Sequence, residues 1–155
     1  MKVLMVCLGN ICRSPVAEGV LRKLAKDKGL QLQVDSAGTA GYHIGSHPDK
    51  RSIKNAKKNG VDISNLVARK FSVNDFDNFD RIYALDANNL RDINHLARNE
   101  NDKKTTDLLL NALFPAQNKA VPDPYYGFEK DFEEVFQLIH AACDKITDEL
   151  IKELK

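Results

Sequence analysis

The sequence has 155 residues, of which 43% are hydrophobic and 29% are charged, as in a globular protein with one core. We therefore treat residues 1–155 as a single domain. The 23 basic and 22 acidic side chains nearly cancel, which excludes an overall field that would favour nucleic acid or a membrane surface. Three cysteines, an odd number, argue against a secreted disulfide framework and favour a reducing compartment, so we expect a cytoplasmic location. No stretch has the length of a signal peptide or a membrane span.

The chain begins with a pattern that predicts a buried strand, a loop and a helix. Residues 3–6 are apolar and rich in strand-forming types. Ser14-Pro15 is typical of a helix start, because Ser caps free backbone N–H groups and Pro fits the first helical position. Apolar residues at helical spacing then continue to a stop at Gly29.

Strands and helices alternate along the rest of the chain. Residues 99–106 are charged and predict an exposed connection, whereas 108–114 fit either a fourth strand or a helix. This order predicts a three-layer α/β sandwich with a central, mostly parallel four-stranded sheet flanked by helices, which binds ligands at the carboxyl ends of its strands. The other expected elements are a strand at 30–35, a small-residue loop at 36–41, a helix at 48–60, a strand at 82–85, a helix at 90–96 and an amphipathic helix at 132–150.

The loop at residues 7–13 has the composition of an anion site. A strand-to-helix turn directs several backbone N–H groups and the positive end of the helix dipole at one point. Gly9 and Asn10 are residue types that readily adopt left-handed backbone angles in such a turn. The same groups, with Arg13, would favour the thiolate form of Cys7. Because Arg13 can hold two oxygens of a phosphate at once, we expect Cys7 to attack a bound phosphorus atom.

Displacing an oxygen leaving group from phosphorus also needs a proton donor. Asp123 is the best candidate, because Pro122 and Pro124 hold it stiffly in a loop that continues into Tyr125 and Tyr126. A solvated surface position explains almost all the other acidic residues. We therefore expect Asp123 to act as the general acid.

Two separated motifs resemble those of one known family. Residues 6–18, Val-Cys-Leu-Gly-Asn-Ile-Cys-Arg-Ser-Pro-Val-Ala-Glu, are similar to the phosphate-loop motif of the low-molecular-weight protein tyrosine phosphatases. Residues 123–127, Asp-Pro-Tyr-Tyr-Gly, match a later motif of that family, and residues 35–38 and 90–92 agree as well. The resemblance covers nearly the whole chain. It implies hydrolysis of phosphotyrosine in proteins, and of small aryl phosphates, without a metal or another cofactor.

The resemblance also implies a role for each catalytic residue. Cys7 would form a phosphocysteine intermediate, and Arg13 would hold the phosphoryl oxygens. Asp123 would protonate the leaving phenolate and then activate the hydrolytic water. The implied partners are phosphotyrosine-containing proteins, with inorganic phosphate or other oxyanions as product or inhibitor.

Further residues are implied to bind the phosphate, support the loop or line the cleft. Ser14 would hydrogen-bond the sulfur of Cys7. The implied phosphate-binding residues are Leu8, Gly9, Asn10, Ile11, Cys12, Arg13 and Ser14. The implied supports of the loop are Asn10, Ser14 and Ser36. The implied walls of the substrate cleft are Leu8, Tyr42, Tyr125 and Tyr126.

One position departs from the family pattern. The family commonly has a His shortly before an Ala-Arg pair, where it helps to hold the Asn of the phosphate loop. This chain has Leu66 at that place, before Val67-Ala68-Arg69. Because Leu66 cannot donate a hydrogen bond, the support of Asn10 must be altered or supplied by another residue.

The other cysteines and the histidines have simpler interpretations. Cys12 is the family's second loop cysteine, which suggests a reversible disulfide with Cys7 that protects against over-oxidation; the alternative is a small buried residue. Cys143 lies on the apolar stripe of the last helix and is expected in the core. We expect no metal site, since no second cysteine pair exists and no ligand spacing is found among His43, His47, His95 and His140.

Three alternative functions remain open on the sequence alone. An arsenate reductase of the same fold would bind a similar oxyanion, but it commonly relays a disulfide through further cysteines, and only Cys143 follows Cys12. A phosphoarginine phosphatase typically has Thr at the position of Ile11. A catalytically idle phosphate-binding module would not need Cys7, Arg13 and Asp123 together.

Overall fold

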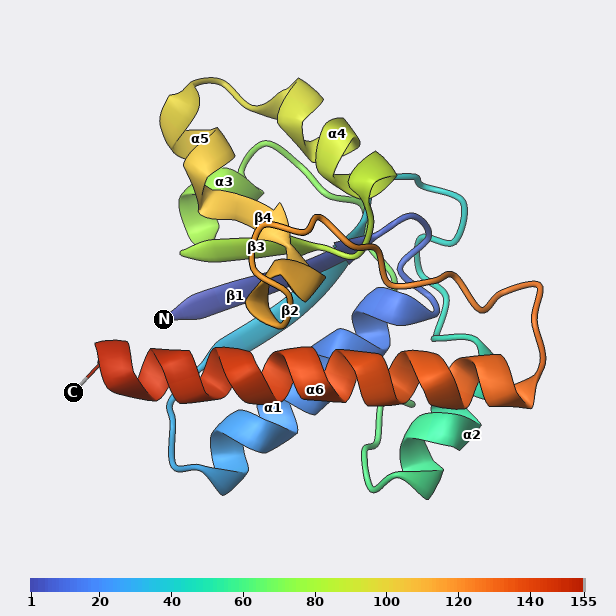
Figure 1. The fold of residues 1–155 in the computed structure, drawn as a ribbon. Helices are drawn as coiled ribbons and strands as arrows, with labels where there is room; N and C mark the ends of the chain where they lie inside the picture. The colour runs from blue at the N-terminus through green and yellow to red at the C-terminus, as the bar shows by residue number, and fades with distance from the viewer. Residues whose placement is uncertain (155) are drawn as a thin grey trace.

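The computed structural model describes residues 1–154 and places a parallel sheet at the centre of the chain (Figure 1). The strand order is β2-β1-β3-β4, and each neighbouring pair is parallel. The predicted α/β fold with a four-stranded sheet is therefore confirmed. The strands are β1 (Lys2–Cys7), β2 (Gln33–Gly38), β3 (Arg81–Ala84) and β4 (Thr106–Leu108).

Helices cover both faces of this sheet. Figure 1 shows α1, α2 and α6 on one face and α3, α4 and α5 on the other. No helix within residues 1–154 is long and apolar enough to cross a membrane. The helical segments are α1 (Arg13–Asp27), α2 (Lys50–Lys58), α3 (Asp75–Asn78), α4 (Ala87–Leu96), α5 (Glu100–Thr105), the 3₁₀ turn η1 (Leu109–Ala112) and α6 (Glu129–Glu153).

Strand β1 is buried on both faces, which explains its continuous apolar sequence. Because side chains alternate along a strand, Val3 and Met5 pack with α1 and α6, whereas Leu4 and Val6 face the cluster that holds α3 and α4. The same alternation turns Cys7 toward the α1 side. The last residue of the strand thus lies next to the start of the helix that follows it.

The start of α1 differs from the prediction. The helix begins at Arg13, so Pro15 is its third residue and Ser14 lies within the first turn instead of capping it. Cys12 is the N-cap residue and its side chain makes no capping hydrogen bond. The predicted Ser14 cap was wrong because the Ser14 hydroxyl is bonded to Cys7 and Asn10 instead.

Two other segments also differ from expectation. The predicted loop at 36–41 was wrong in its first half, because Ser36 and Gly38 pair with Met5 and Cys7 and extend β2. The charged segment 99–106 forms α5, capped by the Asn99 side chain. Residues 108–114 combine both predicted outcomes, since β4 ends there and continues directly into η1.

Candidate active site

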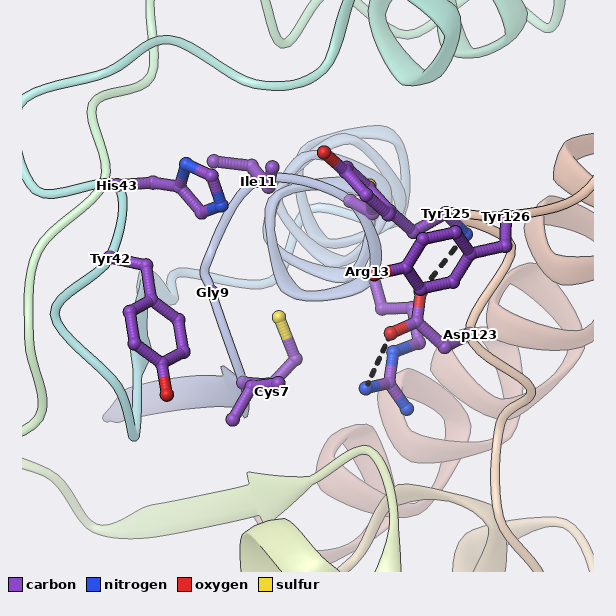
Figure 2. A pocket seen from close by; sticks show the side chains of 11 residues that line it. Cys7, Gly9, Ile11, Arg13, Tyr42, His43, Asp123, Tyr125 and Tyr126 are labelled. Atoms are coloured by element: carbon purple, nitrogen blue, oxygen red, sulfur yellow. Dashed lines mark hydrogen bonds and ion pairs between the residues drawn. The ribbon is translucent and has the colours of Figure 1, made fainter.

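A pocket of about 270 Å³ opens at the carboxyl end of β1, where the chain turns into α1 (Figure 2). It lies at the edge of the sheet where parallel α/β folds bind ligands. The structure brings together residues from three separate parts of the chain around this pocket. Its lining consists of Cys7, Leu8, Gly9, Ile11, Cys12, Arg13, Tyr42, His43, Asp123, Tyr125 and Tyr126.

The sulfur of Cys7 lies 3.0 Å from the hydroxyl oxygen of Ser14. The Ser14 oxygen also accepts a hydrogen bond of 2.7 Å from Asn10 Nδ2. Since the amide already donates to this oxygen, the hydroxyl hydrogen of Ser14 is free to point at the sulfur. This arrangement allows Ser14 to stabilise negative charge on Cys7.

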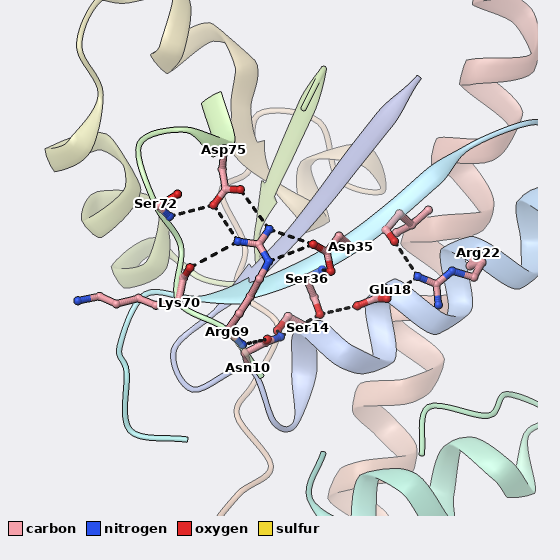
Figure 3. A network of polar contacts seen from close by, with 11 residues as sticks. Asn10, Ser14, Glu18, Arg22, Asp35, Ser36, Arg69, Lys70, Ser72 and Asp75 are labelled. Atoms are coloured by element: carbon pink, nitrogen blue, oxygen red, sulfur yellow. Dashed lines mark hydrogen bonds and ion pairs between the residues drawn. The ribbon is translucent and has the colours of Figure 1, made fainter. Parts of the chain in front are cut away.

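Asn10 connects the loop to neighbouring parts of the chain by hydrogen bonds (Figure 3). Its backbone has φ 57°, the left-handed conformation that Asn tolerates better than most residues. The side chain is almost fully buried and donates to Ser36 Oγ at 2.9 Å as well as to Ser14. Its oxygen accepts a 3.1 Å hydrogen bond from the backbone N–H of Arg69. All the hydrogen-bonding groups of this amide therefore have partners among residues of the site.

The backbone of Arg69, three residues after Leu66, supplies a hydrogen bond to Asn10. The Arg69 guanidinium is held by Asp35 at 3.0 Å and by both carboxylate oxygens of Asp75 at 3.1 Å (Figure 3). These contacts fix the backbone whose N–H reaches Asn10. Leu66 itself packs against the core and its carbonyl accepts a hydrogen bond from a neighbouring imidazole.

The support extends through Ser36 to a buried carboxylate. Ser36 Oγ donates to Glu18 Oε1 at 2.6 Å, and Arg22 donates to the other oxygen of Glu18 and to the carbonyl of Val34. Burial raises the pKa of Glu18 above its usual range, against the opposing effects of Ser36 and Arg22. The structure makes Glu18 the far anchor of the Asn10 support.

Arg13 is almost fully buried, and two hydrogen bonds fix the orientation of its guanidinium group. Its Nη1 atom donates to Asp86 Oδ2 at 2.7 Å and to the carbonyl of Val121 at 2.9 Å. Both hydrogens of Nη1 are thus used, whereas Nε and Nη2 make no hydrogen bond to another residue in the described part of the chain. Asp86 was not predicted as a site residue, although it follows a buried strand, at the edge where parallel α/β folds bind ligands. It also caps α4.

Asp123 approaches the pocket from the segment 122–127 (Figure 2). Its Oδ2 lies 3.7 Å from Arg13 Nη2, and its Oδ1 accepts a hydrogen bond from the backbone N–H of Tyr125. This turn holds the carboxylate, whose side chain remains 46% exposed, over the pocket. Tyr125 and Tyr126 follow and pack edge to face with ring centroids 5.0 Å apart.

The opposite wall is formed by Tyr42 and His43 (Figure 2). Tyr42 is exposed, as expected for a residue at the rim. A Cβ at Gly9 would lie 3.0 Å from the His43 side chain, so Gly9 lets this wall approach the loop closely. The left-handed conformation expected at Gly9 was wrong, since in this loop only Asn10 has a positive φ. His43 was not predicted as a site residue, and it lines the pocket in the structure.

Cys12 lines the pocket and is a free, buried thiol. Burial and the nearby carboxylate of Asp49 raise the pKa of Cys12 to about 12, so it stays protonated at neutral pH. The protective disulfide stays a prediction. Among residues 1–154, no three side chains of His, Cys, Asp or Glu lie where they could hold a metal ion.

Comparison with known proteins gives concordant results. The chain matches the family model described as low molecular weight phosphotyrosine protein phosphatase over residues 2–155. A relative of that name from Gallus gallus is 44% identical over 143 residues, covering 91% of this chain and 90% of its own length. A protein tyrosine phosphatase from Entamoeba histolytica, with Hepes in its active site, superposes with a TM-score of 0.92 at 36% identity, covering 100% and 99% of the two chains. Vibrio vulnificus Wzb, in complex with benzylphosphonate, gives a TM-score of 0.85 at 30% identity over 96% and 97% of the chains.

Proposed function

Because this chain belongs to the low molecular weight phosphotyrosine protein phosphatase family and is a phosphotyrosine phosphatase, we propose that Cys7, Arg13 and Asp123 carry out the hydrolysis. The observation that carries this assignment is their convergence on one pocket from positions far apart in the chain. A sulfur, a guanidinium and a carboxylate are the nucleophile, the charge stabiliser and the proton donor that the reaction needs.

In the first step the Cys7 thiolate attacks the phosphorus atom, and the bond between phosphorus and the tyrosine oxygen breaks. Asp123 gives its proton to the leaving phenolate, so the products are tyrosine and a phosphocysteine. The position of Asp123 above Arg13 supports this role, because the bridging oxygen of a bound phosphate ester would lie on the open side of the loop.

Arg13 holds the phosphoryl oxygens with Nε and Nη2, the two nitrogens that Asp86 and Val121 leave free. The planar guanidinium then offers two parallel N–H groups to two oxygens. Backbone N–H groups at the start of α1 add to this, since no side chain caps that end of the helix. The charge that develops on the equatorial oxygens thus meets donors already in place.

In the second step a water molecule attacks the phosphocysteine and Asp123, now a carboxylate, accepts its proton. The bond between sulfur and phosphorus breaks, and inorganic phosphate and the Cys7 thiolate are released. Ser14 favours this departure because its hydroxyl is placed to donate to the sulfur. The same contact therefore serves both formation and breakdown of the intermediate.

Phosphoproteins are the substrates and oxyanions are ligands of the site. Tyr42 on one wall, with Tyr125 and Tyr126 on the other, form an aromatic cleft around the sulfur. We propose that the phosphotyrosine ring lies between them, where it makes aromatic contacts that phosphoserine cannot make. Inorganic phosphate, as product, would compete for the loop.

The position of Cys143 supports this assignment over arsenate reduction. Cys143 is fully buried in the core, so it is poorly placed to relay a disulfide from the pocket.

We also propose that the enzyme works in the cytoplasm, because all three of its cysteines are free thiols and a reducing compartment keeps them so.

The decisive experiment replaces the nucleophile. We expect Cys7→Ser to lower hydrolysis of an aryl phosphate by roughly 10⁴-fold or more, while inorganic phosphate still binds because the loop donors remain. Activity that survives this change would refute a thiolate mechanism. A parallel metal-free assay should find turnover of a phosphotyrosine peptide far above that of phosphoserine and phosphoarginine peptides, with arsenate reduction by a thiol donor as the control.

A further inference from the structure

A second hollow of about 460 Å³ lies beside the active site, between α2 and the start of α6. Figure 1 shows these two elements at the same end of the molecule, and Asn55 on α2 donates to Glu133 on α6 at 3.1 Å. We refer to this hollow as the basic groove. Its principal lining residues are Arg51, Lys54, Lys58, Phe128 and Phe132.

The groove carries an excess of positive charge. Five of the nine residues of α2 are Lys or Arg and none is acidic. Arg51 is compensated by Asp49, whose carboxylate accepts its Nε and Nη2 at 3.0 and 2.9 Å. Lys54 and Lys58 are exposed, and among residues 1–154 neither makes an ion pair. The acidic side chains near them are Glu129, which lines the groove, and Glu133, which bonds Asn55 and whose pKa Lys58 helps to lower. The free charges of this surface are therefore two lysines on one face of α2, at helical spacing.

The groove also offers aromatic surface. Phe128 is 76% exposed, although a phenylalanine gains most by burial. Phe132 forms the floor, with the Arg51 guanidinium 4.7 Å from its ring centroid. An exposed aromatic ring beside two free ammonium groups suits a partner segment that is acidic and also carries an apolar side chain.

Arg51 connects the basic groove to the active site. Its Nη2 donates to the carbonyl of Tyr125 at 2.9 Å, and its guanidinium carbon lies 5.5 Å from the Tyr125 ring centroid. Tyr125 in turn lines the pocket that holds Cys7. A peptide that leaves the pocket over Tyr125 therefore meets the groove next.

We propose that the basic groove binds the acidic residues that flank the phosphotyrosine in the substrate protein, an inference that rests on the proposed phosphatase function. Lys54 and Lys58 pair with the carboxylates, while an apolar side chain of the same segment packs on Phe128. The occupant is thus the substrate chain itself, and the groove selects among phosphotyrosine sites by the charge around them.

The test reverses the charge of the groove in the double variant Lys54→Glu/Lys58→Glu. The matched control is Lys145→Glu/Lys152→Glu, which changes the net charge equally on exposed positions of α6 toward its far end. Three substrates are compared: a phosphotyrosine peptide with acidic flanks, the same peptide with alanine flanks, and p-nitrophenyl phosphate. The measurement is kcat/KM at low and at high salt.

For the acidic peptide, we expect the groove variant to lose about fivefold to tenfold in kcat/KM at low salt, mainly through KM, and the loss to shrink at high salt. The alanine peptide and p-nitrophenyl phosphate should change less than about twofold, and the control variant should behave as wild type on all three substrates. Equal losses on the two peptides, or an equal loss in the control variant, would overturn the proposal. If wild type hydrolyses p-nitrophenyl phosphate without preferring the acidic peptide, only this inference fails; if wild type hydrolyses none of the three, the proposed function fails.

Discussion

The two segments that meet at the active site are held in opposite ways. Residues 7–14 are held by hydrogen bonds among buried groups. Asn10 alone bonds three residues, Ser14, Ser36 and Arg69. Residues 122–127 are mostly exposed, and Asp123 is held by a local turn to Tyr125 and by a 3.7 Å ion pair to Arg13. The first segment is held by a buried network, whereas the second is held at the surface by its own turn, by Arg13 and by the hydrogen bond from Arg51 to the Tyr125 carbonyl.

This difference matches the role that we propose for each segment. Donors that stabilise charge on a phosphoryl group act best when they need not reorganise during the reaction, which requires a rigid frame. A proton donor that also meets a protein substrate must remain accessible at the mouth of the pocket. Changes in the buried segment should therefore affect all substrates and stability together, whereas changes in the exposed segment should affect particular chemical steps.

The largest effect expected from a conservative change is at Arg13. Arg13→Lys keeps the positive charge but offers one point charge in place of a fork, and it cannot bond Asp86, Val121 and the phosphate together. We expect kcat to fall by about 10²–10³-fold on every substrate. Arg98→Lys, on an ion pair outside the pocket, is the control and should retain nearly full activity. A loss below tenfold for Arg13→Lys would contradict the two-oxygen clamp.

The next largest effect tests the exposed segment alone. Asp123→Asn keeps an oxygen for the Tyr125 N–H but cannot donate the proton. We expect turnover to fall by roughly 10²-fold for phenyl phosphates with poor leaving groups and much less for p-nitrophenyl phosphate. The midpoint of urea unfolding should stay near that of wild type, since the side chain is exposed. An equal loss across leaving groups would argue against the acid role.

The buried segment is tested by paired variants at Asn10. Asn10→Ala removes three hydrogen bonds and strains a left-handed position, whereas Asn10→Gly removes the same bonds without strain. We expect kcat to fall about tenfold in both, equally for good and poor leaving groups, because the loop loses its shape. Unfolding free energy should fall by about 1–3 kcal/mol in the Gly variant, and further in the Ala variant. Wild-type stability with reduced activity would show that the contacts beneath the loop are not what orders it.

The same contrast explains what could be predicted from the sequence. Residues 6–18 and 123–127 are continuous motifs, and the apolar runs of β1 and α6 have clear patterns, so the fold and the candidate site residues were accessible. The hydrogen bond from Arg13 to Asp86 joins residues 73 positions apart in the sequence, and the one from the Arg69 N–H to Asn10 joins residues 59 positions apart. The periodicity of apolar residues along the sequence cannot predict hydrogen bonds between such distant positions.

Burial of small polar residues limited the prediction in another way. Ser36 lies in β2 and α5 is mostly charged, yet both are ordered by polar contacts. Ser36 bonds Asn10 and Glu18. Asp102 of α5 accepts from Arg98, whose guanidinium also donates to Asp77. Polar sequence normally indicates a loop, so the pattern alone placed these segments outside regular structure. A buried polar network can only be recognised once its partners are brought together.

The smallest effect expected is a pH dependence of stability that arises from Glu18, the buried carboxylate bonded to Ser36. Burial raises the pKa of Glu18, so the folded state binds this proton more tightly than the unfolded state, where the ordinary value is 4.5. The contribution of Glu18 to stability is therefore fully present below pH 4.5 and is lost as the pH rises through the higher pKa of the folded state. In Glu18→Gln this dependence should be absent, so wild type should lose stability relative to the variant as the pH rises, measured by urea unfolding in steps above pH 4. Glu134→Gln removes an exposed carboxylate from α6 and should follow wild type. If wild type instead gains stability relative to Glu18→Gln over this range, the hydrogen bonds from Ser36 and Arg22 outweigh burial, and Glu18 acts as a fully ionised anchor of the loop.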